Sequence, residues 1–313
     1  MQYVIGVDLG GTQLRAVRMD RHGHIHDSQR VATAAAAGPE IVIGQIVALV
    51  NAAIGTTPRD AIIGIGVGSP GPLNPYTGVV LQAPTLLGWF DVPLRALLTA
   101  ALGLPVAINN DANVAALGEW RFGAGRGCTH FMYVTVSTGI GGGVILDGRL
   151  MLGRHGMAAE VGHMIVDPRG PQCDCGSYGC WEAHASGSAL ARAAVAASQR
   201  APGSSLCAID PKLLTARHVF DAARGGDALA GDLVRDEGFW LGVGIVSLLH
   251  LYSPERVALG GGVAQALPDL LPHIRAVIAE RAMIPFRDVQ IVQAELGDSA
   301  GVIGAATLAL ADA

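Results

Sequence analysis

Three cysteines and a histidine gather in one short part of the chain, AEVGHMIVDPRGPQCDCGSYGCWE, residues 159–182. Cys173, Cys175 and Cys180 lie within eight residues, and His163 precedes Cys173 by ten. Three thiolates and one imidazole complete a tetrahedral zinc site without an open position, and such sites are structural rather than catalytic. The spacing differs from that of common zinc fingers, and chance clustering of buried cysteines is the alternative. We interpret these four residues as zinc ligands.

Two carboxylates flank this cluster. Glu160 lies three residues before His163, and Glu182 lies two residues after Cys180. A zinc ion that orders the segment would also hold both carboxylates in place, as a binding site for a polar ligand requires. Ordinary surface charge is the alternative interpretation of the two glutamates.

A glycine turn with an acidic residue follows the first apolar run, in DLGGT, residues 8–12. The backbone N–H groups of Gly10 and Gly11 can approach an anion closely, because glycine has no side chain in the way. Thr12 adds a hydroxyl donor and Arg15 a cation, while Asp8 can hold Mg²⁺ through water. The alternative is a plain hairpin turn, in which glycine and aspartate are common.

A second glycine turn, STGIGGG at residues 137–143, also lies between two apolar runs. Thr138 and Gly139 offer the same kind of anion cradle, and a simple tight turn is again the alternative. Together the two turns resemble the paired phosphate loops of actin-like, sugar-kinase and Hsp70 ATPases. That resemblance implies ATP held between two domains. It also implies that a third turn, LGGGVA at 259–264 with Gly261 and Gly262, contacts the adenosine end.

A polar pair stands at a predicted junction of strand and helix, in INNDAN, residues 108–113. Asn110 and Asp111 can both cap a helix, which would be a purely structural role. Ligands of α/β proteins bind at the carboxyl ends of strands, however, and this junction is such an end. A carboxylate there can accept the proton of a hydroxyl that attacks phosphorus.

One motif suggests a dinucleotide site that we reject. GVGSPG, residues 66–71, has the spacing G-x-G-x-x-G after an apolar run. A dinucleotide site needs a helix to begin at this turn, whereas Pro70, Pro72 and Pro75 predict a loop. We expect this loop to lie over a small substrate with its backbone.

The composition indicates a large α/β protein. The chain has 313 residues, of which 50% are hydrophobic and 43 are glycine, and this length is typical of two domains. Lys212 is the only lysine, so neither a P-loop nor the strand lysine of protein kinases is present. The net charge of −5 without a basic patch argues against nucleic acid and anionic membranes as partners.

The compartment is expected to be the cytoplasm. The N-terminus has no signal-peptide pattern, and the most apolar later run, residues 239–252, is shorter than a membrane span of roughly 20 residues. Disulfides are then improbable, and clustered cysteines indicate metal binding. Cys128 and Cys207 have no evident partner.

The elements that must position these residues follow from hydrophobic periodicity. Buried strands are expected at 3–8, 61–68 and 105–109, and a helix from Asp111 to about Phe122. Residues 129–148 repeat the strand, glycine turn and strand of the N-terminus, which suggests an internal duplication. We expect an N-terminal α/β domain at 1–115 and a larger α/β domain with the zinc site at 116–296. The last helix, about 297–313, is expected to pack back on the first domain.

The order of the motifs carries a family resemblance. DLGGT, GVGSPGP, NNDAN, STGIGGG, E-x-x-H, CDCGSYGC-x-E and ALGGGV cover nearly the whole chain. In this order and spacing they resemble the ROK family of bacterial sugar kinases and repressors. The resemblance implies two actin-like (ribonuclease H-like) ATPase domains with a cleft between them, and a zinc-pinned loop in the second. ALGEWRFGAGRG, residues 116–127, is most similar to the glucose-phosphorylating branch.

The resemblance also implies roles for single residues. Asp111 is expected to be the general base, and Asp8, Thr12 and Thr138 match the Mg²⁺ and phosphate positions. The sugar is expected to contact Gly68, Asn110, Asp111, Glu160, His163 and Glu182. His163 would bind zinc through one ring nitrogen and sugar through the other, which is plausible because a metal fixes the tautomer. The chain departs from the family at Ala159, where many relatives have glycine, and we expect little effect.

Several alternatives remain at this stage. The sugar could be fructose, mannose, allose or N-acetylmannosamine instead of glucose, and the phosphoryl donor could be polyphosphate instead of ATP. A non-catalytic sugar sensor would retain the fold, whereas an actin- or Hsp70-like assembly ATPase should lack the zinc motif. The family's repressors carry a helix-turn-helix domain before the first strand, for which there is no room before Tyr3. The resemblance further implies a homodimer or homotetramer.

Overall fold

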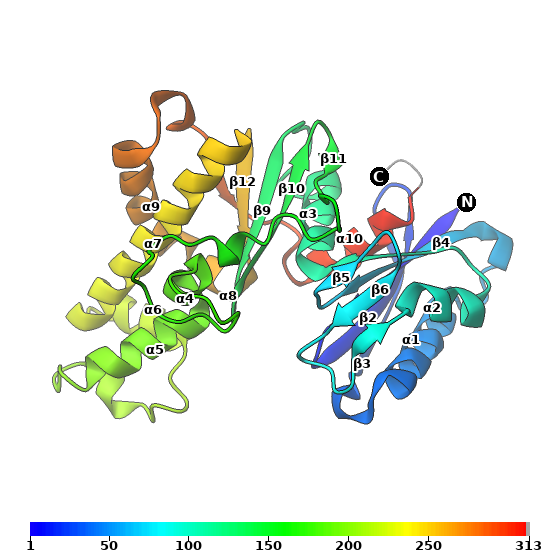
Figure 1. The fold of residues 1–313 in the computed structure, drawn as a ribbon, viewed down its shortest axis with the longest axis horizontal. Helices are drawn as coiled ribbons and strands as arrows, with labels where there is room; N and C mark the ends of the chain where they lie inside the picture. The colour runs from blue at the N-terminus through cyan, green and yellow to red at the C-terminus, as the bar shows by residue number, and fades with distance from the viewer. Residues whose placement is uncertain (311–313) are drawn as a thin grey trace. The chain divides into compact units, whose positions relative to one another are not determined.

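A computed structural model describes residues 1–310 (Figure 1). The chain forms two compact units. The first contains residues 1–129 and 143–159 and the C-terminal segment from Glu295, and the second contains residues 130–142 and 160–294. The division that we placed near residue 115 falls inside a helix of the first unit, and residues 311–313 of the predicted last helix lie outside the described residues.

The first unit is built on a five-stranded sheet in the order β3-β2-β1-β4-β8. Its strands are β1 (Tyr3–Leu9), β2 (Gln13–Asp20), β3 (Ile25–Ala32), β4 (Ile62–Ser69) and β8 (Val106–Asn110). β1 pairs antiparallel with β2 but parallel with β4, and β4 pairs parallel with β8. Because β1, β4 and β8 are parallel, their carboxyl ends lie along one edge of the sheet. The register places Asp8 beside Gly68, and Ser69 beside Asn110.

Helices cover this sheet on both faces, as expected for central strands that are apolar throughout. The helices of the first unit are α1 (Pro39–Ile54), α2 (Leu94–Leu102), α3 (Asp111–Phe122) and α10 (Ala300–Leu308). Successive side chains of β1 point to opposite faces. Ile5 therefore packs with Val42 and Ile46 of α1, whereas Val4 packs with Val302 of α10.

Two glycines allow α10 to lie directly on the sheet. A Cβ atom at Gly6 of β1 would meet the carbonyl oxygen of Val302, and one at Gly66 of β4 would meet that of Ala305. Any larger residue at either position would push the helix away from the strands. These glycines therefore explain how the C-terminal helix closes one face of the first unit.

A small three-stranded sheet follows β4, and its first strand lies in the predicted loop that contains Pro70, Pro72 and Pro75. It contains β5 (Leu73–Asn74), β6 (Val79–Gln82) and β7 (Phe90–Val92), in that order. Helix α2 begins at Leu94, after β7 and Pro93. Such short strands give too little periodicity to be predicted, since pairing with one another is what defines them.

The second sheet has the strand order β11-β10-β9-β12-β13. Its strands are β9 (Phe131–Val136), β10 (Ile140–Leu146), β11 (Arg149–Leu150), β12 (Arg256–Gly260) and β13 (Gln290–Gln293). β9, β12 and β13 run parallel. The strand, glycine turn and strand expected at 129–148 are therefore present.

The second unit is rich in helices around a long central one. They are α4 (Trp181–Ala185), α5 (Gly187–Ser198), α6 (Ala216–Arg224), α7 (Ala228–Tyr252), α8 (Gly261–Ala264) and α9 (Leu267–Arg281). The apolar run 239–252 lies in α7, which packs against α9, α6, α4 and α5. Within the described part of the chain, no helix has the length and apolar character needed to cross a membrane.

Short 3₁₀ helices complete the secondary structure of the described residues. They are η1 (Ala35–Ala37), η2 (Arg59–Ala61), η3 (Val161–His163), η4 (Ser205–Ala208), η5 (Ile284–Phe286) and η6 (Gly297–Ser299). η3 carries His163, one of the four predicted zinc ligands.

The fully buried carboxylate of Glu119 ties together two distant parts of the first unit. It accepts hydrogen bonds from the backbone N–H groups of Ala124, at 2.9 Å, and of Glu295 and Leu296, at 3.1 and 2.7 Å. The chain first passes into the second unit after Thr129 and returns for the last time at Glu295. Glu119 thus fixes the backbone close to both passages.

We expect Glu119→Ala to lower the free energy of unfolding by about 3 kcal/mol or more, because it leaves three backbone donors without their acceptor. Urea denaturation measures this change. A matched control is Glu295→Ala, which removes the half-exposed partner of Arg126 and should cost less than about 1 kcal/mol. Equal effects of the two substitutions would contradict this role of Glu119.

Candidate active site

The first glycine turn places Asp8 at the carboxyl end of β1. The turn is closed by a hydrogen bond from Gly10 N to Gln13 O of 3.0 Å, and Thr33 Oγ1 donates to Gly10 O at 2.7 Å. Burial raises the pKa of the Asp8 carboxyl, against the opposing effect of Arg15, whose Nε lies 3.8 Å from Asp8 Oδ2. A carboxylate in such a setting gains from a nearby cation, so the predicted Mg²⁺ role is consistent with its surroundings.

Asn110, rather than Asp111, is the N-cap of α3. Asn110 Oδ1 accepts from Ala112 N at 2.9 Å, in the usual capping arrangement. Asp111 is the first residue of the helix; it is exposed, and its Oδ1 also lies 2.8 Å from Ala112 N. The positive end of the helix dipole favours the ionised form of a carboxyl placed there. Asp111 is therefore not the N-cap but an exposed carboxylate in the first turn of α3.

Gly68 lies on β4 next to α3. A Cβ atom at Gly68 would meet the side chain of Val114. Close packing of helix on strand thus explains this glycine without a ligand, although the backbone of β4 still ends at the same sheet edge as Asp8 and Asn110. The predicted site residues of the first unit are those of the first glycine turn with Arg15, together with Gly68, Asn110 and Asp111.

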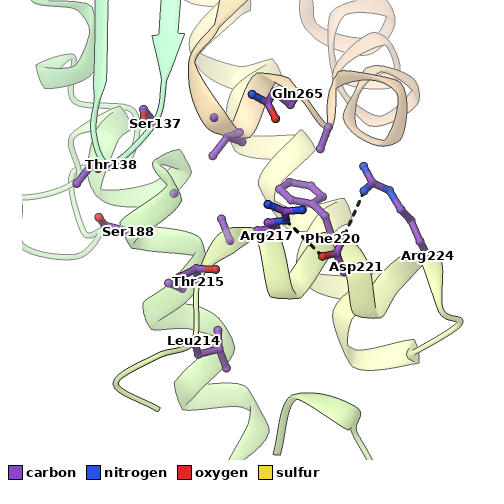
Figure 2. Close-up of a pocket in the computed structure, with 16 residues that line it drawn as sticks. Ser137, Thr138, Ser188, Leu214, Thr215, Arg217, Phe220, Asp221, Arg224 and Gln265 are labelled. Atoms are coloured by element: carbon purple, nitrogen blue, oxygen red, sulfur yellow. Dashed lines mark hydrogen bonds and ion pairs between the residues drawn. The ribbon is translucent and has the colours of Figure 1, made fainter. Parts of the chain in front are cut away.

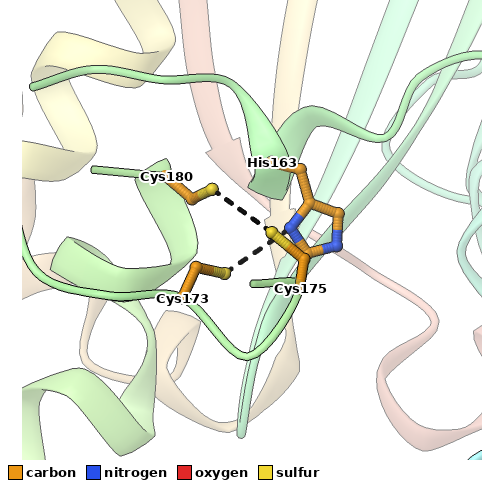
Figure 3. A group of neighbouring side chains, drawn as sticks. All are labelled: His163, Cys173, Cys175 and Cys180. Carbon is orange, nitrogen blue, oxygen red and sulfur yellow. Dashed lines mark hydrogen bonds between the residues drawn. The ribbon is translucent and has the colours of Figure 1, made fainter. Parts of the chain in front are cut away.

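The four predicted zinc ligands come together in the second unit (Figure 3). The ligand atoms of His163, Cys173, Cys175 and Cys180 all lie within 4.8 Å of one another. His163 Nδ1 is 3.7 Å from Cys173 Sγ, and the Sγ atoms of Cys175 and Cys180 are 3.6 Å apart. One imidazole and three thiols at these distances match a closed tetrahedral zinc site.

Local turns bring the cysteines to this geometry. Cys173 N donates to Ser177 O at 2.8 Å, which folds the segment between the ligands into a tight loop, with Gly176 at φ 90°. Burial raises the pKa of the Cys180 thiol to about 12. A metal ion displaces the thiol protons when it binds, and its positive charge stabilises the resulting thiolates in these apolar surroundings.

Glu182 joins the zinc cluster to the second glycine turn. Its Oε2 accepts from the backbone N–H of Ile140 at 2.8 Å, and its Oε1 lies 3.8 Å from Cys173 Sγ. A Cβ atom at Gly139 would meet this carboxylate. Gly139 is therefore required by the contact with Glu182, a cause that the sequence analysis missed because the two residues are 43 positions apart.

The second glycine turn opens onto a cavity of about 620 Å³ within the second unit (Figure 2). Ser137 and Thr138 of the turn, Gly262 of α8 and Ser188 of α5 line one part of it. The other part is lined by α6 and the residues before it, among them Leu214, Thr215, Arg217, Phe220, Asp221 and Arg224. Polar turns at one end and an aromatic and aliphatic wall suit a ligand with both phosphate and a flat base.

The contribution of α6 was not anticipated. Arg217 Nε lies 3.7 Å from Asp221 Oδ2, and Arg224 donates to Asp269 at 2.6 Å, so ion pairs order the arginines at the cavity wall. Arg217, Phe220 and Asp221 have the i, i+3, i+4 spacing of residues on one face of a helix, and this spacing was the only signal in the sequence that they lie together.

The sequence matches the ROK family over residues 4–312. The chain belongs to the ROK family. It is 37% identical to a glucokinase of Streptomyces coelicolor, over 99% of this chain and 98% of that protein. Among solved structures it resembles a ROK glucokinase of Streptomyces griseus in complex with glucose and AMPPNP, with a TM-score of 0.81 and 36% identity over 98% of both chains. A ROK hexokinase of Thermus thermophilus has a TM-score of 0.84 and 37% identity over 99% of both chains.

The ROK relatives confirm the predicted fold of two actin-like (ribonuclease H-like) α/β domains, together with a loop whose Cys/His cluster fits structural zinc. The predicted site residues fall into two groups. One belongs to the first unit, at the carboxyl edge of its sheet, and the other to the second unit, around the zinc cluster and the large cavity. Glu160 is exposed, and its carbonyl oxygen accepts from His163 N at 3.1 Å.

The departure from the ROK pattern at Ala159 has a structural consequence. Ala159 has a φ of 67°, in the left-handed region that glycine adopts without strain. The glycine expected at this position in relatives is thus explained by the backbone that precedes Glu160.

We expect Ala159→Gly to raise stability by up to about 1 kcal/mol, because relief of left-handed strain exceeds the extra chain entropy of glycine. Ala158→Gly is the matched control, since Ala158 is not among the residues with positive φ, and it should lower stability by roughly 0.5–1 kcal/mol. Thermal melting shows whether each variant is more or less stable than wild type. Destabilisation by both substitutions would refute the strain at Ala159.

Proposed function

We propose that this chain is an ATP-dependent kinase that phosphorylates glucose at its 6-hydroxyl. The observation that carries the proposal is full-length similarity to glucokinases, in a chain that retains a carboxylate at the N-terminus of α3. A protein that only senses sugar would not need Asp111, Asp8 and both glycine turns together.

Asp111 is the general base in this proposal. Its carboxylate accepts the proton of the sugar 6-hydroxyl as that oxygen forms a bond to the γ-phosphorus of ATP. The bond from this phosphorus to the β,γ-bridging oxygen breaks, and ADP leaves. An ionised carboxylate at this position can take up the proton.

The sugar hydroxyls are proposed to form hydrogen bonds with Asn110, Glu160, His163 and Glu182. The backbone at Gly68 is proposed to contact the sugar as well. His163 turns Nδ1 toward the cysteines (Figure 3), which leaves Nε2 as the nitrogen for a sugar hydroxyl. Zinc on Nδ1 would fix the proton on Nε2, so that this nitrogen donates. Glu182 Oε2 accepts from Ile140 N and Oε1 contacts Cys173 Sγ at 3.8 Å, so the proposed bond to a sugar hydroxyl uses the remaining acceptor capacity of Oε1.

The nucleotide is proposed to occupy the cavity of the second unit. Thr138, Gly262 and α6 line this cavity. Thr138 and Gly139 would face the phosphates of the nucleotide, and Gly261 and Gly262 its adenosine. Gly10, Gly11, Thr12 and Arg15 would contact the transferring phosphoryl group from the first unit. Mg²⁺, when bound near Asp8, supplies charge neutralisation of the phosphate oxygens.

The assembly and the compartment complete the proposal. We propose a homodimer or homotetramer that acts in the cytoplasm and binds neither nucleic acid nor membranes. Light scattering after size-exclusion chromatography measures the mass of the assembly, and a monomer at working concentration would contradict it.

A coupled ADP-release assay with MgATP tests the function against glucose, fructose, mannose, allose, N-acetylglucosamine and N-acetylmannosamine. We expect the highest kcat/KM on glucose. A higher value on another sugar would keep the kinase and change its substrate. Release of no ADP with any sugar, from folded protein containing zinc, would refute ATP-dependent sugar phosphorylation, and a second run with polyphosphate would then separate a different donor from a sensor.

A further inference from the structure

The first turn of α10 lies against the side chain of Asp8 within the first unit. α10 begins at Ala300, and its second residue is Gly301. A Cβ atom added at Gly301 would lie 3.1 Å from each of three atoms of Asp8, namely Cγ, Oδ1 and Oδ2. No point in the plane of a carboxyl group is that far from all three of its atoms, so the Cβ position lies over the flat face of the group. Glycine at 301 therefore leaves this face of the Asp8 carboxyl group uncovered by a side chain.

The position of α10 beside Asp8 is fixed by contacts of backbone with backbone. Gly6 of β1 and Gly66 of β4 hold the helix on the sheet, as described above. A Cβ atom at Gly304 would likewise meet the carbonyl oxygen of Val114 in α3. Close packing of this kind leaves no flexible side chain that could turn aside and let the helix move. The first turn of α10 is therefore a rigid neighbour of the Asp8 carboxyl group.

Arg15 contacts both Asp8 and the segment that leads into α10. Its Nε lies 3.8 Å from Asp8 Oδ2, and its Nη1 donates to the carbonyl oxygen of Asp298 at 2.7 Å. Asp298 belongs to η6, which ends where α10 begins. Within residues 1–310, no hydrogen bond to the Asp8 carboxyl oxygens accompanies this ion pair. Packing against Gly301 and one ion pair thus determine the orientation of the carboxyl group.

The orientation of the Asp8 carboxyl group decides where its lone pairs point. Donors approach a carbonyl or carboxylate oxygen near the plane of the group, rather than over its face. Mg²⁺ keeps several water molecules and demands nearly octahedral geometry, so a carboxylate that holds such water has little freedom in its position. A residue that sets the plane of the Asp8 carboxyl group would therefore affect Mg²⁺ more strongly than it affects the sugar.

We propose that Gly301 is a positioning residue for the Mg²⁺ site. Because it has no side chain, the Asp8 carboxylate can adopt the orientation in which it holds the metal through water. This role rests on the proposed function, in which Asp8 holds Mg²⁺. It also explains why a glycine occupies the second position of α10, where alanine would be the better helix former.

Gly301→Ala tests the proposal, because its methyl group meets the carboxyl group. A contact of 3.1 Å is tighter than most Cβ atoms make, and the carboxyl group has to shift by a few tenths of an ångström to relieve it. We expect the variant to bind Mn²⁺ about tenfold more weakly than wild type, as is found when residues that orient metal ligands are replaced. Electron paramagnetic resonance of Mn²⁺ measures this on protein saturated with AMPPNP and glucose, without turnover. The Tm should not fall, since alanine is favoured in a helix, and the KM for glucose should be unchanged.

Two further variants calibrate the measurement. Gly44→Ala makes the same replacement inside α1 of the same unit, where a Cβ atom would have no neighbour within 4 Å. It should bind Mn²⁺ as wild type does. Asp8→Asn removes the carboxylate itself and should weaken Mn²⁺ binding at least as much as Gly301→Ala does.

The outcomes distinguish a failure of this proposal from a failure of the proposed function. Wild-type affinity in Gly301→Ala, together with weak binding by Asp8→Asn, would overturn the role of Gly301 and leave Asp8 at the metal site. Wild-type affinity in both variants would contradict the Mg²⁺ role of Asp8, and the role of Gly301 with it. A Gly301→Ala chain that does not fold would also overturn the proposal, because the helix rather than the carboxyl group would then have moved to make room for the methyl group.

Discussion

Replacing Asp111 with alanine is expected to lower kcat on glucose by about 10²–10⁴-fold while the protein stays folded, because the reaction loses its general base. Asp111→Asn should behave similarly, since an amide cannot take up the proton. The α3 cap remains in both variants, because Asn110 provides it. Initial rates at saturating MgATP and glucose, with thermal melting of each variant, give the measurement.

Glu40→Gln is the matched control. Glu40 is also an exposed carboxylate in the first turn of a helix of the same unit, α1, and it is not among the predicted site residues. It should keep kcat within about twofold, because a surface charge at a helix N-terminus contributes only about 0.3–1 kcal/mol to stability. Near-native turnover by folded Asp111→Ala would disprove the assignment of the base.

Loss of the zinc site is expected to have the second large effect. Cys180→Ser should abolish stoichiometric zinc, lower the Tm and raise the KM for glucose by about 10–100-fold, as the metal orients His163 and the loop beside Glu182. Cys180 is the residue immediately before α4, so its loss frees the start of the helix that carries Glu182. Metal analysis, thermal melting and steady-state kinetics on the same preparation test the three effects together.

Cys207→Ser is the control for this prediction. Cys207 is exposed and lies outside the zinc cluster, where its thiol contacts the carbonyl oxygens of Ser198 and Ala201. The zinc content of the Cys207→Ser protein and its KM for glucose should equal those of wild type. A Cys180→Ser protein that keeps the wild-type KM would show that the zinc cluster does not support the sugar site.

The parts of the site that were predictable are local in sequence. The four zinc ligands fall within 18 residues, so their types and spacing were enough to name them before their geometry was known. The helix from Asp111 to Phe122 was predicted with its bounds, because a polar pair precedes an apolar stretch of helical period. The short sheet of β5 to β7 was missed for the opposite reason, since its strands are two to four residues long and are defined by pairing.

By itself, the sequence determined the family, the zinc ligands and the candidate base, because each depends on residue types at short, fixed spacings. Tertiary structure alone decided the partners of buried groups. Glu119 accepts from backbone donors 176 and 177 residues away, and Glu182 accepts from Ile140. The donors that a buried carboxylate meets depend on how distant segments pack. Spacing along the chain does not predict that packing.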